Sequence, residues 1–299
     1  MRYAVSCGTV LACSLLSALP AAGAVIYNNL TPNNLMAVAT RPEVGSSFEI
    51  EAADDFVLES QTIVTSASFV GLIVGGTGTP SISDLVVEMY RVFPNDSNVA
   101  RTSGPPTFAT SQVPTRVNSP SDVAFASRDS ASSELTFTSS VGASFTALNS
   151  VQPGGIHPMP GQTTGGNGPL TGQEVQINVT LTVPFNLPAD HFFFVPQVAL
   201  TGGAQFYWLS ASRPIMGTGT TPFPPGVTDL QSWTRDAMLD PDWLRVGMDI
   251  VGGNPAPTFN QAFSLDGTVV PEPGTIILTL VGIGLVTVGR LRRKDVDRN

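Results

Sequence analysis

The stretch VQINVTLTV at residues 175–183 alternates aliphatic and polar side chains over its whole length. Successive side chains of a β-strand point to opposite faces, so this alternation predicts a strand with one buried face. The aliphatic residues expected on the buried face are Val175, Ile177, Val179, Leu181 and Val183. The amide and hydroxyl groups between them are expected on the opposite face.

Other strand signals recur on both sides of this stretch. The longer ones lie at residues 63–74, 85–92, 192–198, 205–209 and 259–265, and the shorter ones at 48–50, 122–126, 135–138, 143–148 and 246–251. Residues 229–239 are the best candidate for a helix, a short one with Thr228 or Asp229 as its N-cap. Ten or more short strands with one buried face predict an all-β fold, a single antiparallel β-sandwich or jelly roll.

Three segments between the expected strands are rich in Gly, Pro and Thr, which predicts long loops at 94–120, 149–172 and 211–226. Long loops on a β scaffold often carry binding sites. The alternative is surface decoration without a binding role.

The composition of the 299-residue chain narrows the class of protein. Charged residues make up 12 % and hydrophobic residues 42 %, with 29 glycines and 25 prolines. The charges are too few for a disordered acidic chain, and the helix breakers are too many for a coiled coil or a helical bundle. The formal charge of −9 argues against a nucleic-acid partner, which would need a basic face.

The N-terminus has the three-part pattern of a secretory signal peptide over residues 1–24. A short basic start precedes an apolar run that ends before Pro20. Ala22 and Ala24 stand at the spacing that signal peptidase reads, so we expect cleavage before Val25. A buried N-terminal helix and a retained anchor are the alternatives, and the break at Pro20 argues against both.

Both cysteines of the chain, Cys7 and Cys13, lie in the segment that would be removed. The mature chain would then have no disulfide, no thiolate and no Cys-ligated metal. We therefore expect its stability to come from a packed core. A lipoprotein attached through Cys13 is disfavoured because the apolar run before that cysteine is short.

The C-terminus carries Pro271, Glu272 and Pro273, then an apolar run at 274–289 and a tail at 290–299. The basic residues that follow the apolar run directly are Arg290, Arg292, Arg293 and Lys294. A helix over the apolar run would span about 24 Å, slightly less than the ~30 Å hydrocarbon core, which predicts a short transmembrane helix. Basic residues stay on the cytoplasmic side, so everything before the run would lie outside.

This order of Pro-Glu-Pro, apolar helix and basic tail resembles the PEP-CTERM sorting signal of Gram-negative bacteria. The resemblance implies that exosortase, a membrane-embedded cysteine transpeptidase, recognises Pro271, Glu272 and Pro273 and removes the tail. It also implies delivery to the cell surface. The signal peptide adds the secretion machinery and signal peptidase as partners, and the basic tail adds a transient inner-membrane stage with the ectodomain in the periplasm. A plain single-pass anchor is the alternative. The expected domains are a signal peptide (1–24), a β-sandwich ectodomain (25–269) and a sorting signal (270–299).

Residues 52–58, AADDFVL, are similar to a segment near the start of many PEP-CTERM ectodomains. Residues 243–247 and 259–267 are similar to the closing segments of such exported proteins. These resemblances imply a fold and a destination, and they imply no activity.

Few residues are candidates for catalysis or metal binding. His157 and His191 lie in no ligand or nucleophile motif, so we expect loop and strand-edge roles rather than a Ser/His/Asp triad. Acidic residues gather twice, at positions 49, 51, 54 and 55 and at positions 236, 240, 242 and 249. Paired carboxylates serve glycoside hydrolysis, but oxygen-rich loops suit calcium better. The candidate calcium ligands are Asp236, Asp240 and Asp242, with solvated turns as the alternative.

The part between the two terminal signals, residues 25–270, has eight arginines, no lysine and twenty acidic residues, a formal charge of −12. Such a surface is compatible with neutral or cation-bridged polysaccharide. Trp208, Trp233 and Trp243 are candidates for stacking on sugar rings, and burial in the core is the alternative. We predict a non-enzymatic exported protein with a structural or adhesive role and no resident cofactor. A module that binds extracellular polysaccharide, with or without calcium, is the alternative, and a glycan hydrolase is the least favoured.

Overall fold

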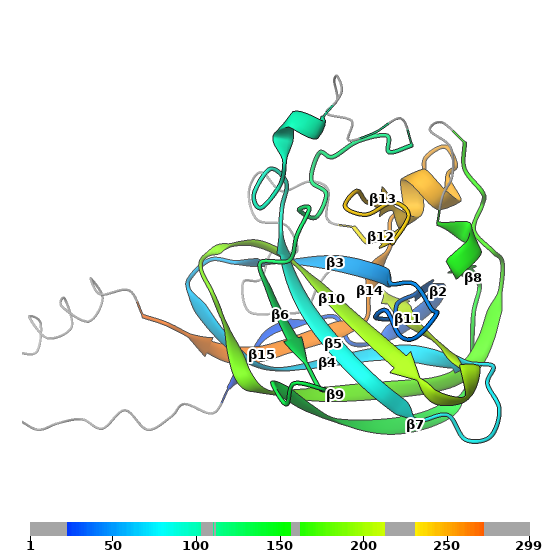
Figure 1. Ribbon diagram of the computed structural model, residues 1–299, viewed down its shortest axis with the longest axis horizontal. Helices are drawn as coiled ribbons and strands as arrows, with labels where there is room; N and C mark the ends of the chain where they lie inside the picture. Colours follow the sequence, from blue (N-terminus) through cyan, green and yellow to red (C-terminus); the bar gives the residue numbers. More distant parts are fainter. Residues whose placement is uncertain (1–22, 103–109, 111, 157–161, 213–230, 272–299) are drawn as a thin grey trace, which may run out of the picture.

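The computed structural model describes residues 23–102, 110, 112–156, 162–212 and 231–271 (Figure 1). The described chain is all-β, as predicted, and its strands form two sheets. No helix within these ranges is long and apolar enough to cross a membrane. The predicted transmembrane helix at 274–289, the basic tail, His157 and nearly all of the signal peptide lie outside the described residues.

The larger sheet has nine strands, and its main path is β1-β15-β4-β11-β2-β8. Strand β9 pairs with the other side of β4, β7 pairs with β9, and β14 pairs with β11. Its strands are β1 (Ala24–Asn28), β2 (Pro32–Ala39), β4 (Thr62–Val74), β7 (Leu135–Ala147), β8 (Asn149–Val151), β9 (Leu170–Leu187), β11 (Gln205–Ala211), β14 (Asn260–Gln261) and β15 (Phe263–Val269). The described pairs are antiparallel except β2 with β8, which is parallel.

The smaller sheet has six strands in the order β13-β12-β3-β10-β5-β6. Its strands are β3 (Ile50–Leu58), β5 (Ile82–Arg91), β6 (Ala126–Asp129), β10 (Asp190–Leu200), β12 (Trp233–Asp236) and β13 (Leu244–Arg245). Short helical turns complete the described chain at η1 (Val99–Arg101), η2 (Pro153–Gly155), η3 (Thr201–Gly203) and η4 (Val246–Val251).

The alternating stretch 175–183 lies in β9, which is longer than predicted. The first four aliphatic side chains of the stretch are buried, but Val183 is 44 % exposed. The register between β4 and β9 shifts here, because Thr180 pairs with Ser66 whereas Phe185 pairs with Val64. Val183 falls within this bulge, where the chain leaves the regular alternation.

Several shorter strand predictions need correction in position. The signal at 48–50 covers only the entry into β3, and most of 122–126 is irregular chain before β6. The signals at 135–138 and 143–148 belong to one strand, β7. The run 259–265 is divided between β14 and β15. Strand position here depends on pairing with distant segments, which a local pattern does not contain.

Two predictions were wrong in the type of element. The described part of 229–239 is not helical, because Trp233 and its neighbours pair with β3 as strand β12 and a turn follows. Residues 246–251 form the π-helical turn η4 rather than a strand. The carboxylate of Asp249 accepts the backbone N–H of Arg245 (2.8 Å) and closes this turn.

Aromatic rings meet at the centre of the core between the two sheets. Phe263 on β15 stacks against Tyr27 on β1, with ring centroids 4.2 Å apart, and against Phe194 on β10 at 5.0 Å. The indole of Trp208 lies edge-on to Phe263 at 5.7 Å, and its Nε1–H donates to the carbonyl of Ala262 (2.9 Å). Trp208 is fully buried, so it is a core residue and has no exposed ring face for a sugar.

Truncation of this central ring is expected to destabilise the protein strongly. Phe263→Ala should lower the free energy of unfolding by about 3–5 kcal/mol, because it removes buried surface and leaves a cavity. Urea unfolding of the purified protein measures this change. The matched control is Phe48→Ala, since Phe48 is 40 % exposed and rests mainly on Arg41. The control should lose about 1 kcal/mol or less, and equal losses in the two variants would contradict the central role of Phe263.

Candidate functional site

Both faces of the six-stranded sheet are buried, and only one of them faces the nine-stranded sheet. On β10, Phe192 and Phe194 belong to the core between the sheets, whereas Phe193 and Val195 belong to a second apolar cluster. Adjacent strand residues point to opposite faces, so the second cluster lies on the outer face of this sheet. It also contains Ala53, Tyr90, Trp233 and Trp243. A strand covered on both sides reads as a continuous apolar run in the sequence, as the run Phe192-Phe193-Phe194 does.

Trp233 and Trp243 are therefore not surface residues. Their exposed fractions are 0 % and 1 %, so neither ring is open to a sugar. The Nε1–H of Trp243 donates to the carbonyl of Ser121 (3.1 Å), and its ring meets Tyr90 edge-on at 5.4 Å. Of the two alternatives that the sequence left open for these tryptophans, the structure supports burial.

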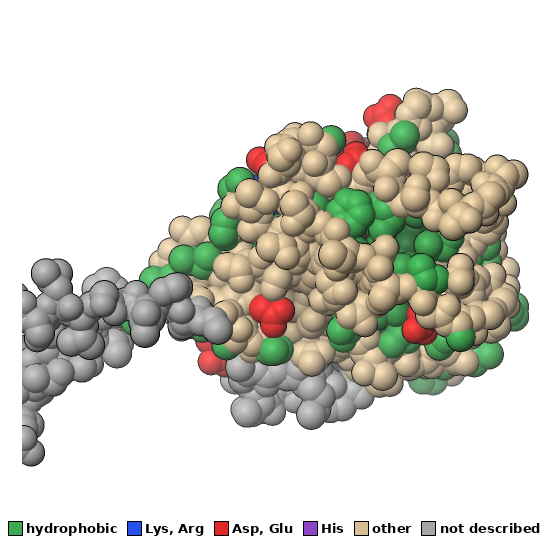
Figure 2. Space-filling model, turned by 90° about the horizontal axis from the view of Figure 1, so that it is seen from below, with side chains coloured by type: hydrophobic (Ala, Val, Ile, Leu, Met, Phe, Trp, Pro, Cys, Tyr) green, Lys and Arg blue, Asp and Glu red, His purple; other side chains and the backbone are tan. Residues whose placement is uncertain are grey.

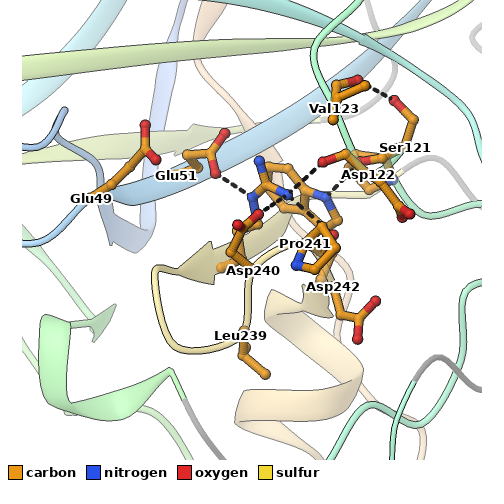
Figure 3. A network of polar contacts seen from close by, with 12 residues as sticks. Glu49, Glu51, Ser121, Asp122, Val123, Leu239, Asp240, Pro241 and Asp242 are labelled. Atoms are coloured by element: carbon orange, nitrogen blue, oxygen red, sulfur yellow. Dashed lines mark hydrogen bonds and ion pairs between the residues drawn. The ribbon is translucent and has the colours of Figure 1, made fainter. Parts of the chain in front are cut away.

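Arg235 on β12 is the charged centre of this outer face. Figure 3 shows residues around it, among them Glu51, Asp122 and Pro241. Arg235 pairs across the sheet with Glu51 on β3, and its Nε donates to a Glu51 carboxylate oxygen. One terminal nitrogen donates to the hydroxyl of Tyr90 (2.8 Å). The other donates to the carbonyls of Asp122 (3.2 Å) and Pro241 (3.1 Å). We call this set the Arg235 network.

Aromatic rings surround the guanidinium of the Arg235 network. Its central carbon lies 4.3 Å from the ring centroid of Trp243 and 5.2 Å from that of Tyr90. The Arg235 side chain is 5 % exposed. The exposed Asp240 forms an ion pair with it, with 3.0 Å between a terminal nitrogen of Arg235 and a carboxylate oxygen of Asp240. A guanidinium is less strongly hydrated than an ammonium and stacks on rings, which makes arginine the cation suited to such a place.

Three carboxylates converge beside the Arg235 network, those of Glu49, Glu51 and Glu88. One oxygen from each lies within 4.8 Å of the others. The hydroxyl of Tyr90 is 2.8 Å from Glu51 and 3.2 Å from Glu88. Gln197 donates its amide to Glu49 (2.9 Å). Figure 3 shows Glu49 next to Glu51 at the edge of the network.

The hydrogen-bond count at Tyr90 favours a proton on Glu88. The tyrosine hydroxyl has one hydrogen, and it also accepts a bond from Arg235, so it cannot donate to both Glu51 and Glu88 at once. Burial, together with the nearby negative charges of Glu51 and Glu49, raises the pKa of Glu88 from 4.5 to about 8. Burial also raises the pKa of Tyr90, which keeps its hydroxyl protonated. We therefore expect the three carboxylates of Glu49, Glu51 and Glu88 to hold one proton, on Glu88, near neutral pH.

Within the described residues, the trio of Glu49, Glu51 and Glu88 is also the only set of three or more possible metal ligands (His, Cys, Asp or Glu) whose ligand atoms all lie within 4.8 Å of one another. Both oxygens of its central residue, Glu51, are already bonded, one to Tyr90 and one to Arg235. Calcium takes 6–8 oxygen ligands, so this arrangement suits a proton better than that ion.

The three aspartates expected to bind calcium do not form a common site. Asp236 accepts the backbone N–H groups of Met238 (2.9 Å) and Leu239 (3.1 Å), Asp240 pairs with Arg235, and Asp242 pairs with Arg101 (2.6 Å). A turn that caps itself and two ion pairs account for their positions. Asp236 and Asp242 are buried, so solvated turns, the alternative, describe only the exposed Asp240. Calcium binding by this protein stays a prediction.

A second set of ion pairs joins the first long loop to this region. Asp122 pairs with Arg101 (3.2 Å) and with the buried Arg116, and Arg101 also pairs with Asp242. The guanidinium of Arg116 lies 4.2 Å from the ring centroid of Phe93. The loop prediction for residues 94–120 gave these arginines no role. Two arginines in a lysine-free segment with Asp96 as its one acidic residue were the signal that could have found them.

Two acidic residues of the AADDFVL segment are buried in β3, and being adjacent in the strand they form hydrogen bonds on opposite faces of the sheet. Asp54 accepts the backbone N–H of Gln261 (2.9 Å), which links β3 to β14 of the other sheet. Asp55 lies 2.6 Å from Nε2 of His191 on β10, and the imidazole stacks on Phe193. His191 is the second residue of β10, at the beginning of the strand, and its contact with Asp55 joins β10 to β3.

Both ends of the body leave from the same edge of the nine-stranded sheet. Ala24 pairs with Gly267 and Val25 with Asp266, so β1 and β15 run side by side (Figure 1). The expected cleavage point thus lies within β1 as the structure draws it. Pro271 is exposed two residues beyond β15, whereas Ala22, Glu272, Pro273, Arg290, Arg292, Arg293 and Lys294 lie outside the described residues.

Comparison with known proteins identifies the C-terminal segment. The family model for the PEP-CTERM protein-sorting motif matches residues 269–294, from the last residue of β15 onward. No curated protein and no solved structure matches the chain. The resemblance seen in the sequence is confirmed for this segment.

The raised pKa of Glu88 predicts a pH-dependent stability. Between pH 4.5 and about 8 the folded chain keeps a proton on Glu88 that the unfolded chain has lost, so stability should fall as the pH rises through this window. Glu88→Gln cannot lose a proton, and its melting temperature should fall less than that of the wild type between pH 5 and 9. Calorimetry of both proteins across this range measures the effect. Glu59→Gln, at an exposed position, is the control and should follow the wild type; parallel curves for Glu88→Gln would contradict the assignment.

Loss of the Arg235 guanidinium should be costly because it leaves Glu51 buried without its counter-charge. Arg235→Met should lower the free energy of unfolding by about 3–5 kcal/mol. Arg91→Met is the matched control, since Arg91 and Asp96 pair at 2.6 Å with side chains about a quarter exposed. The control should lose less than about 1 kcal/mol, and urea unfolding separates the two results. Similar losses for both arginines would show that burial of the pair is not decisive.

Proposed function

We propose that this chain serves at the cell surface or in the extracellular matrix as a non-catalytic structural or adhesive protein. It carries a PEP-CTERM sorting motif and is accordingly an exported protein sorted by exosortase. The observation that carries the proposal is the position of the motif. It begins at Val269, where the last strand of the folded body ends.

This position lets the tail be removed without loss of any described strand. Strand β15 lies between β1 and β4, and all of it precedes Pro271. Removal of the chain beyond residue 273 would therefore leave both sheets complete. Because β1 is the neighbour of β15, the two terminal signals are attached at one edge of the body, which suits an intermediate held at the inner membrane with its body in the periplasm.

The use of the charged residues supports a structural role for the body. Glu51, Asp122 and Asp242 are buried and paired with arginines, and Asp55 is paired with a histidine. These contacts hold loops and strands together. The three tryptophans that suggested a polysaccharide site are buried, so they lend that alternative no support.

Processing at both ends can be tested on the protein made in its natural host. Intact-mass analysis should find a mature chain without residues 1–24 and without the segment that follows Pro271, Glu272 and Pro273. Glu272→Ala should keep the tail and hold the protein in the membrane fraction, because the sorting enzyme would no longer recognise the motif.

The control for this experiment is Glu59→Ala, which removes an exposed carboxylate from the body and should be processed like the wild type. Recovery of the wild-type chain from the cytosol with both ends intact would overturn the proposal. Normal removal of the tail from Glu272→Ala would show that the glutamate is not part of the recognition element.

A further inference from the structure

Strand β7 is the one long strand at an edge of the described sheets. It spans thirteen residues and pairs with β9 alone, whereas the other edge strands, β1, β6, β8, β13 and β14, have five residues or fewer. An edge strand presents a row of backbone N–H and C=O groups that can pair with another strand. In Figure 1, β7 lies at the lower border of the molecule, away from the six-stranded sheet.

Both faces of β7 are open over residues 138–144, whereas Leu135 and Ala147 near its ends are buried and Phe137 is half-buried. Every residue from Thr138 to Ser144 is exposed, and Val141 is 54 % exposed. Val141 pairs with Val175 and Ser139 with Ile177, and both of these β9 residues are buried. The face of the sheet that is covered along β9 is thus uncovered at Ser139 and Val141 of β7, so this middle part of the strand extends beyond the core, while Leu135 and Phe137 still pack in or against it.

The strand lacks the usual protection of an edge. Its sequence, LTFTSSVGASFTA, contains no charged residue and no proline. Natural edge strands usually carry lysine, an inward charge or proline, or a bulge that turns the edge away. A bulge is present between Val141 and Ser144, which leaves residues 135–141 in unbroken register with β9.

We propose that β7 pairs antiparallel with β7 of a second copy of this chain over residues 135–141, which joins two nine-stranded sheets into one. The absence of charge selects this occupant. The part of the chain between the terminal signals carries −12, so two copies repel each other over most of their surface, but no like charges meet along these seven residues. Figure 2 shows the molecule from below relative to Figure 1, and the atoms coloured there are mainly uncharged polar side chains and backbone, with hydrophobic side chains between them and few acidic ones.

The side chains suit such a symmetric pair. A two-fold axis through Thr138 places each threonine opposite its own copy, Thr136 opposite Ser140, and Leu135 opposite Val141. Hydroxyl pairs and aliphatic pairs directly opposite each other stabilise antiparallel sheets. Because the bulge lies outside residues 135–141, opposed residues share a face throughout. The pairing concerns the folded body alone and does not depend on the sorting step.

Sedimentation analysis of the mature protein purified from its natural host tests the pairing. The wild type should shift from monomer to dimer as its concentration rises. The double variant Thr138→Lys with Ser140→Lys should raise the dissociation constant tenfold or more, because the first substitution places a charge directly opposite its own copy and the second adds a like charge to the same face. The matched control, Thr180→Lys with Thr182→Lys, places the same charges on exposed positions of β9, within the sheet, and should dimerise like the wild type.

Hydrogen exchange on the wild type gives a second reading that needs no variant. The backbone amides of residues 135–141 that face away from β9 should gain protection as the protein concentration rises. A wild type that stays monomeric at millimolar concentration would overturn the proposal, and so would a β7 variant that dimerises as well as the control. Protection of this segment by polysaccharide alone, without dimerisation, would assign the edge to a different occupant and also overturn it.

Discussion

The guanidinium of Arg235 is buried among aromatic rings, and the outer layer of this protein depends on how that charge is satisfied. A buried cation without partners would be too costly to keep, and each of the three donor nitrogens of Arg235 has an acceptor from a different part of the chain. Glu51 comes from β3, Tyr90 from β5, and two carbonyls come from the segments around Asp122 and Pro241. One side chain thereby ties two strands and two connecting segments to the sheet.

The two faces of the six-stranded sheet use different chemistry for this reason. The face toward the other sheet is almost wholly apolar and centres on the stacked rings around Phe263. The outer face combines a small aromatic cluster with arginines and carboxylates. Loops cover it, and loops bring backbone carbonyls that must be bonded, which arginine can do at several points at once. In the mature chain, which we expect to lack cysteine, such networks take the place that cross-links would otherwise have.

The sorting motif begins where the strand pairing of the body ends, so the body does not need the motif to complete its sheets. The last strand, β15, lies within its sheet, and the first strand, β1, is its outer neighbour. The motif thus begins where pairing ends. The same sheet ends at its far side in β7, which pairs with β9 alone and whose faces are open over residues 138–144. The two terminal signals are attached at the β1–β15 side of the sheet, and β7 forms its other side. Such a body is suited to the proposed pairing between two copies through β7 after the tail has been removed.

The sequence alone determined the class of fold, the alternation along β9 and the signal at the C-terminus, because each is written in neighbouring residues. A period of two and a run of apolar residues before basic ones are local patterns, and local patterns can be read without knowing which strands pair. Bulges are not written in this way, so the exposure of Val183 was missed. The tertiary structure alone decided that Trp233 and Trp243 are buried, that the three aspartates separate, and that Glu49 and Glu51 meet Glu88. These outcomes depend on β12 lying beside β3, although Arg235 and Glu51 are 184 residues apart, and hydrophobic alternation does not specify which strand becomes whose neighbour.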